Sequence, residues 1–248
     1  MNAFLPGQRV HCIGIGGAGM SGLARLLQAR GLIVSGSDPV PSALTESLHH
    51  DDGIAVGYVQ DGSAVTTGLQ WVVTTAAAKA DNPELAQARR LGIPTLKYAQ
   101  ALGMLMRERV GIGIAGTHGK TTTSSWLAYA LRLAGKQPSF LIGGSAHLLG
   151  TNAFADRGAY FVAEACEYDR SFHHMQPMIA VITNIDADHL DYYGSLEAIH
   201  EAFARYVAQV PPTGLIVVNG DDPATVETVR RAAIARVVTY GQGVENDW

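Results

Sequence analysis

Residues 113–124 read GIAGTHGKTTTS, and this stretch constrains the fold more than any other part of the 248-residue sequence. The apolar run VGIGIAG leads into it, and a helix-like apolar pattern follows from about Lys120 to Ala134, ending before Gly135. Glycines between a strand and a helix let backbone N–H groups turn toward an anion, and the helix adds the positive end of its dipole. The stretch therefore predicts a phosphate-binding loop in an α/β domain, with an ordinary glycine turn as the alternative.

The loop is a variant of the nucleoside triphosphate pattern G-x-x-x-x-G-K-[ST], because Ile114 stands where a glycine is usual. In this pattern Lys120 can reach the β- and γ-phosphates, and the Thr121 hydroxyl can bind the accompanying Mg²⁺. The expected phosphate-binding residues are Gly116, Thr117, His118, Gly119, Lys120, Thr121 and Thr122.

Strand-like and helix-like segments alternate along the chain, which predicts an α/β fold with mainly parallel sheets. We expect a Rossmann-like domain over residues 1–107 and a P-loop α/β domain over residues 108–248, with the boundary placed by motif order. Expected strands lie at 10–17, 32–38, 54–56, 71–75, 110–116, 160–165, 178–185 and 214–220. Expected helices lie at 19–30 and 120–134, and others start after Pro83, after Ser195 and at Pro223.

A second glycine-rich loop, GIGGAG at residues 14–19, follows the first expected strand and opens a helix. Gly14, Gly16 and Gly19 fit the dinucleotide pattern G-x-G-x-x-G, and Asp38 follows at the end of the next strand. This arrangement suits NAD, with Asp38 on the ribose. It suits a nucleotide sugar equally well, because the loop and the helix N-terminus favour any diphosphate. A tight turn without a ligand is the third possibility.

Acidic residues follow two of the expected strands in the second half of the chain. One set is Glu164, Glu167 and Asp169, and the other is Asp186, Asp188, His189 and Asp191. The carboxyl ends of parallel strands meet at one edge of a sheet, and Mg²⁺ takes oxygen ligands. Either set could hold Mg²⁺ beside the phosphate loop, or form a solvated loop.

The composition argues against several classes of protein. The net charge of −4 combines 18 basic with 22 acidic residues without long runs of either sign, so we expect no nucleic-acid partner. The two cysteines, Cys12 and Cys166, are expected as free thiols in a reducing compartment. No signal peptide or membrane span is evident, which predicts a cytoplasmic protein. The sequence does not determine the oligomeric state.

Six motifs, in order, resemble the Mur ligases of bacterial cell-wall (peptidoglycan) synthesis. They cover nearly the whole chain. The motifs are GIGGAGMSGLA (14–24), SGSD (35–38), TTAAAKADNPE (74–84), AGTHGKTTT (115–123), EACEYDRSF (164–172) and TNIDADHLD (183–191).

The resemblance implies an ATP-dependent, ADP-forming amide ligase. ATP would phosphorylate the carboxylate of UDP-N-acetylmuramate, and the amino group of L-alanine would attack the acyl phosphate. Lys120, Glu164 and His189 would be catalytic, with Thr121 and Glu164 on one Mg²⁺ and His189 on a second. His118, Asn184 and Asp188 would lie nearby. The UDP-sugar would bind Gly14, Gly16, Gly17, Ala18, Gly19, Met20, Ser37, Asp38, Thr74, Thr75 and Ala76.

Two departures from the family pattern affect these expectations. Some relatives carry a carbamylated lysine at the position of Ala204, so none is expected here. Family members are longer and carry a third domain, so we expect this chain alone to be inactive in ligation while still binding UDP-N-acetylmuramate. The alternatives are a sister ligase that adds a tripeptide to the same UDP-sugar, an NAD-dependent oxidoreductase and a non-catalytic precursor sensor. The wording GIGGAGM favours the alanine-adding reaction.

Overall fold

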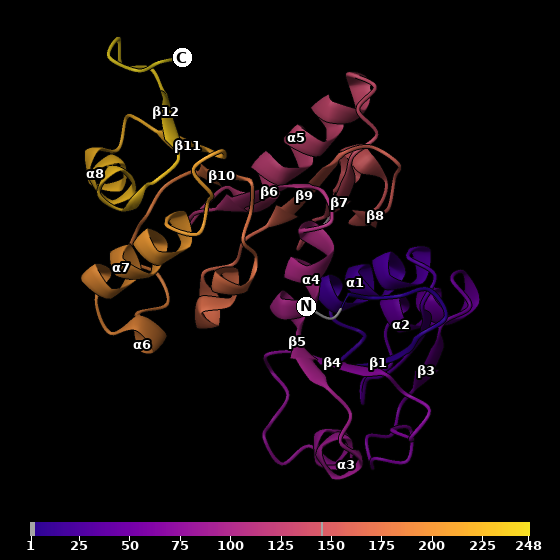
Figure 1. Cartoon of the computed structure of the whole chain (residues 1–248). Helices are drawn as coiled ribbons and strands as arrows, with labels where there is room; N and C mark the ends of the chain where they lie inside the picture. Colours follow the sequence, from indigo (N-terminus) through magenta and orange to yellow (C-terminus); the bar gives the residue numbers. More distant parts are fainter. Residues whose placement is uncertain (1–2, 145) are drawn as a thin grey trace. The chain divides into compact units, whose positions relative to one another are not determined.

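The computed structural model describes residues 3–144 and 146–248, coloured along the chain in Figure 1. The chain divides into two compact units, which are described separately. The first unit comprises Met1–Met104 with Thr151–Ala155, and the second comprises Leu105–Gly150 with Asp156–Trp248.

The first unit is built on a parallel sheet with strand order β3-β2-β1-β4-β5. Its central strand β1 is apolar and buried from Val10 to Ile13, as expected for a strand covered on both faces. The elements are β1 (Arg9–Ile13), α1 (Ala18–Ala29), β2 (Ile33–Ser37), α2 (Ala43–His50), β3 (Ala55–Gly57), β4 (Trp71–Thr74), α3 (Pro83–Leu91), β5 (Thr95–Lys97), α4 (Tyr98–Met106, which runs into the second unit) and β8 (Ala153–Phe154).

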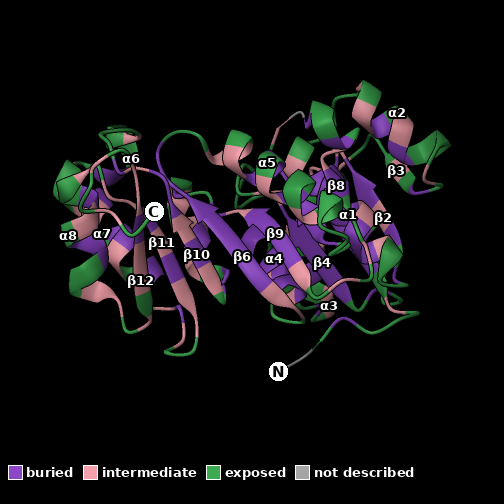
Figure 2. Cartoon of the chain, turned by 90° about the horizontal axis from the view of Figure 1, so that it is seen from above, coloured by how far each residue is buried: buried purple, intermediate pink, exposed green. Residues whose placement is uncertain are grey.

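The strands of the second unit follow the order β12-β11-β10-β6-β9-β7, and every pairing among them is parallel. In the colouring of Figure 2, β6 is buried except at its first residue and β9 is buried except at its two ends. The elements are β6 (Val110–Ala115), α5 (Lys120–Leu133), β7 (Ser139–Leu141), η1 (His147–Leu149), β9 (Tyr160–Glu164), η2 (Tyr168–His174), β10 (Ile179–Ile182), α6 (Leu190–Tyr193), α7 (Leu196–Val207), β11 (Leu215–Asn219), α8 (Pro223–Ala232) and β12 (Arg236–Tyr240).

The α/β fold with mainly parallel sheets is confirmed, and so are two expected helix starts. The Ser195 side chain accepts a hydrogen bond from the Ala198 amide at the start of α7, and Pro223 occupies the first turn of α8. Sequence reasoning missed α2, although Ser42 and Thr45 form a capping box there. It also missed the short strands β7 and β12. Among the described helices, none is both long and apolar enough to cross a bilayer.

Candidate functional site: a phosphate loop and a second nucleotide cleft

Three loops of the second unit converge because they follow three adjacent parallel strands. In the sheet, β6 lies between β10 and β9, with Ile114 opposite Glu164 and Ala115 opposite Ile182. The carboxyl ends of these strands therefore lie at one edge, which is where ligands bind in open α/β sheets. The phosphate loop after β6 thus meets both acidic segments found in the sequence.

The phosphate loop needs glycine at two positions. Gly116 has φ 146° and Gly119 has φ 81°, backbone conformations that residues with a Cβ rarely adopt. A Cβ at Gly116 would also overlap the hydroxyl oxygen of Thr183 on the neighbouring strand end. The loop therefore packs directly against the segment that follows β10.

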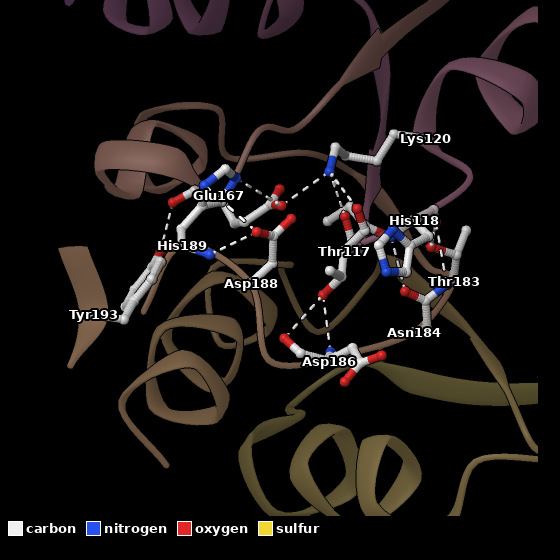
Figure 3. A network of polar contacts seen from close by, with 12 residues as sticks. Thr117, His118, Lys120, Glu167, Thr183, Asn184, Asp186, Asp188, His189 and Tyr193 are labelled. Atoms are coloured by element: carbon white, nitrogen blue, oxygen red, sulfur yellow. Dashed lines mark hydrogen bonds and ion pairs between the residues drawn. The ribbon is translucent and has the colours of Figure 1, made fainter. Parts of the chain in front are cut away.

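Asn184 holds the middle of the loop in place through hydrogen bonds to Thr117 and His118, as Figure 3 shows. Its carbonyl accepts from the Thr117 amide (3.1 Å), its side-chain oxygen accepts from the His118 amide (2.9 Å), and its side-chain nitrogen donates to the His118 carbonyl (3.1 Å). The amides of Gly119 to Thr122, at the N-terminus of α5, form no hydrogen bond within the part of the chain that the structure describes. These amides are the ones free to bind phosphate, whereas those of Thr117 and His118 hold the loop's shape.

The Lys120 ammonium lies inside the loop. It donates to the carbonyls of Gly116 (2.6 Å) and Thr117 (3.1 Å) and to Oε1 of Glu167 (2.9 Å). An ammonium has three donors, so all of them are used. The expected phosphate-binding lysine is therefore held beside the loop by a carboxylate.

Thr121 and Glu164 border one glycine pair. The amide of Gly143 donates to Oε1 of Glu164 (2.9 Å), and a Cβ at Gly144 would come within 3.2 Å of the Thr121 methyl group. Thr121 and Glu164, two of the expected magnesium ligands, therefore both lie next to the turn that follows β7.

His189 contacts Glu167 rather than Glu164. Its Nε2 lies 3.9 Å from Oε1 of Glu167, and its Nδ1 lies 3.8 Å from Oδ1 of Asp188. Glu167 is only 2% exposed. The Tyr193 hydroxyl donates to the backbone carbonyl of Glu167 (2.5 Å). Burial, together with the nearby charge of Glu167, raises the pKa of Tyr193. Glu167 is thus the centre of the polar cluster in Figure 3.

The backbone around this cluster is strained. Asp169 and Arg170 both have φ 53°, and His189 has φ 52°, so three residues with side chains adopt the left-handed conformation. Such strain persists where the surrounding structure enforces it, and it concentrates at functional sites.

The donors at this edge suit magnesium, although they do not form a complete cage. No group of three or more His, Cys, Asp or Glu side chains gathers as a metal site in residues 3–144 and 146–248. Mg²⁺ characteristically uses one or two carboxylates together with phosphate oxygens and water. Oε2 of Glu167 is buried and has no hydrogen-bond partner among the residues that the structure describes, so this oxygen is available as a metal ligand. The residues present therefore fit a magnesium ion that arrives with a nucleotide.

In the first unit, most amides of the second glycine loop are already bonded. The Gly14 and Ile15 amides donate to the Ser37 carbonyl, and the Gly16 amide donates to Oδ2 of Asp38 (3.0 Å). The amides of the first turn of α1 form no hydrogen bond among the described residues. They belong to Ala18, Gly19 and Met20, which were among the expected UDP-sugar residues.

A cavity of about 580 Å³ opens beside this loop. Three of the expected UDP-sugar residues, Gly14, Asp38 and Thr75, line it, together with Gln60 and Asn82, which sequence reasoning missed. Ser37 lies beneath Gln60, which donates to its hydroxyl (3.0 Å). Thr74 is buried in β4 and, like Ala76, is not part of the lining.

A buried polar network supports this cavity. Glu84 is fully buried, and its carboxylate oxygens accept from the Ser37 hydroxyl (2.5 Å) and face Nε2 of His11 (3.2 Å). The Asn82 side chain donates to Gln60 (3.1 Å) and also caps α3. The side chains beside the cavity are therefore fixed by partners in the core.

Family models match nearly the whole chain. Residues 9–110 match the catalytic domain of the Mur ligase family, and residues 114–248 match the Mur ligase middle domain. The chain belongs to the Mur ligase family.

Curated relatives of this Mur ligase carry the same name in several bacteria. The UDP-N-acetylmuramate–L-alanine ligase of Renibacterium salmoninarum is 46% identical over 94% of this chain and 50% of its own length. That of Streptomyces griseus is 43% identical over 97% of this chain and 52% of its own length. The chain thus spans about half the length of the curated relatives it matches.

Solved structures agree with the family assignment. A UDP-N-acetylmuramate:L-alanyl-γ-D-glutamyl-meso-diaminopimelate ligase from Neisseria meningitides has TM-score 0.87 at 33% identity, covering 95% of this chain and 78% of that one. A UDP-N-acetylmuramate–alanine ligase from Thermotoga maritima has TM-score 0.80 at 28% identity, covering 95% and 53%.

Proposed function

We propose that this Mur ligase binds a magnesium–ATP complex in its second unit and UDP-N-acetylmuramate in its first, as part of an enzyme that joins L-alanine to the sugar's carboxylate. The choice of UDP-N-acetylmuramate and L-alanine as substrates is supported by relatives 43–46% identical to the chain, which are named UDP-N-acetylmuramate–L-alanine ligases. The observation that carries the proposal is the loop around Lys120, with unbonded amides at the start of α5 and carboxylates on both sides.

In this proposal the loop residues position the triphosphate. The amides of Gly119 to Thr122 and the dipole of the 14-residue helix α5 bind phosphate oxygens. Lys120 follows the γ-phosphoryl group as it moves to the acceptor carboxylate, so that the products are ADP and an acyl phosphate. Thr121 and Glu164 would hold one Mg²⁺, and His189 would hold a second. When bound, the cations neutralise the charges of two anions that must meet.

The first unit would hold the UDP part of the sugar nucleotide. The diphosphate faces the amides of Ala18, Gly19 and Met20, and the nucleoside enters the cavity between Asp38 and Asn82. Asp38 has both carboxylate oxygens on backbone amides, those of Gly16 and Val40, so it shapes the loop as well as facing the cavity. The NAD hypothesis has no support in the family assignment.

Calorimetric titration of the full chain tests both sites. UDP-N-acetylmuramate and magnesium–ADP should each bind. Lys120→Met should lower the affinity for magnesium–ADP and leave the affinity for UDP-N-acetylmuramate unchanged. Absence of heat with both ligands at millimolar concentration would contradict the proposal. Because we expect this chain alone to be inactive in ligation, ligation is tested with the chain joined to the third domain of an alanine-ligase relative. ADP release measured with L-alanine or with the tripeptide L-alanyl-γ-D-glutamyl-meso-diaminopimelate then distinguishes the two ligase activities. We expect L-alanine to be the acceptor, because the curated alanine-ligase relatives are 43–46% identical to the chain.

A further inference from the structure

Glu167 is a buried carboxylate that belongs to one of the two acidic sets considered for Mg²⁺, but the family resemblance assigns it no role. Its side chain is almost completely enclosed, its Oε1 is bonded to Lys120, and its Oε2 has no hydrogen-bond partner in the described chain. Placing an unpaired carboxylate oxygen in the interior is costly unless a cation compensates it. Among the described residues, the Lys120 ammonium is the lysine or arginine group bonded to Glu167, at 2.9 Å, and Nε2 of His189 lies farther away, at 3.9 Å.

Lys120 cannot reach a phosphate without giving up a present bond. Its three donors are divided among two loop carbonyls and Glu167. The carbonyls belong to the loop itself and stay close to any bound phosphate, whereas Glu167 carries a negative charge and competes with phosphate directly. Glu167 is therefore the partner that the incoming anion must replace.

The charges around the loop oppose a nucleotide that arrives without metal. Glu164, Glu167, Asp186 and Asp188 all lie on the two segments that flank the loop. Lys120 is bonded to Glu167, whereas Arg170 of the same segment lies over the Tyr193 ring, 5.8 Å from its centroid. A triphosphate adds further negative charge to this group. A divalent cation changes the balance, because it attracts both the carboxylates and the phosphates.

We propose that Glu167 makes phosphate binding depend on a divalent cation. In the empty loop its carboxylate holds the Lys120 ammonium and repels metal-free nucleotide. When a divalent cation is bound, the Glu167 carboxylate interacts with that cation instead of Lys120, and the Lys120 ammonium is free to bind the phosphates. Glu167 is a positioning residue that acts through Lys120, and this inference rests on the proposed nucleotide site.

The proposed role of Glu167 is a coupling between metal and nucleotide binding. Removing the carboxylate should therefore raise the affinity for metal-free nucleotide and reduce the gain in affinity that Mg²⁺ provides. Glu167→Gln keeps the size of the side chain and an oxygen acceptor for Lys120, but it removes the charge. We expect this variant to bind ADP in EDTA about tenfold more tightly than the wild type, within the usual range of coupling between sites. The ratio of ADP affinities with and without Mg²⁺ should fall by a similar factor.

The experiment is calorimetric titration of ADP into the full chain, with Mg²⁺ or with EDTA. Glu167→Asp keeps the charge and should keep most of the metal dependence. Glu201→Gln removes an exposed carboxylate from α7 and should behave as the wild type. In a Lys120→Met background, Glu167→Gln should have a smaller effect, because the lysine that Glu167 restrains is gone and only the charge repulsion remains. Unfolding curves of each variant separate these changes from general destabilisation.

The outcomes distinguish the two levels of the argument. If the wild type fails to bind magnesium–ADP, the proposed nucleotide site itself is wrong. If the wild type binds magnesium–ADP and Glu167→Gln leaves metal-free affinity unchanged or lowers it, only the role of Glu167 is overturned. Should Glu167→Gln fold poorly, Glu167→Met provides a second neutral side chain, and the same gain in metal-free affinity is required of it.

Discussion

Removing the Glu84 carboxylate should unfold the first unit at markedly lower urea concentration. Glu84 is 0% exposed and has two side-chain partners, the Ser37 hydroxyl and the His11 ring. Glu84→Ala leaves both without this acceptor, and each buried donor left unsatisfied costs about 1 to 3 kcal/mol. Glu84→Gln retains one acceptor and the shape, so we expect a loss of about 1 to 2 kcal/mol.

Tryptophan fluorescence measures this loss in the first unit alone. Trp71 lies in β4 and is 7% exposed, whereas Trp126 and Trp248 are exposed residues of the second unit. With the latter two replaced by phenylalanine, urea unfolding followed at Trp71 reports only the first unit. The exposed carboxylate of Glu46 supplies the control, because Glu46→Ala should stay within about 0.5 kcal/mol of the wild type.

The same variants test whether the network supports the cavity. Glu84→Ala should also lower the affinity for UDP-N-acetylmuramate, because the side chains of Ser37 and Gln60 lose their fixed positions. Glu84→Ala within about 1 kcal/mol of the wild type, or less destabilising than Glu84→Gln, would refute the reasoning.

Three further predictions follow from single features. Ala18→Asp adds a charge at the first turn of α1 that favours the helix but repels a diphosphate, so UDP-sugar affinity should fall at least about tenfold without loss of stability, whereas Ala18→Asn should change it little. Gly116→Ala should cost about 1 to 3 kcal/mol and abolish nucleotide binding, whereas Gly135→Ala, with positive φ and open space, should cost less and leave nucleotide binding intact. Burial lowers the pKa of His173 below its ordinary 6.5, so its neutral form stabilises the folded state; stability should fall as pH drops from 6.5 through the lowered pKa, and His173→Gln should flatten that slope in acid unfolding curves.

The sequence predicted most of the features that local chemistry determines. Apolar runs marked the buried parallel strands, and the glycines at 116 and 119 marked the phosphate loop because their backbone conformations require glycine. The helix starts at Ser195 and Pro223 followed from capping rules. The weak signal of a short helix was not sufficient for α2, whose capping box in PSALTES is nonetheless visible in retrospect.

What the sequence could not predict depends on contacts between distant segments. Glu164 and Glu167 are both glutamates three residues apart, yet among the described residues Glu167 is the one that forms an ion pair with Lys120. Gln60 lies in a loop without a motif and reaches the cavity through Ser37 and Asn82. Such roles follow from strand register and loop conformation, which residue patterns along one chain do not specify.

A crystal structure of the full chain with ADP and Mg²⁺ is the most direct test of the phosphate loop. We expect the β-phosphate at the amides of Gly119 to Thr122, with the Lys120 ammonium moved from Glu167 onto the phosphate and a cation beside Thr121 and Glu164. ADP bound elsewhere on the chain, or a loop that stays empty at saturating nucleotide, would contradict it.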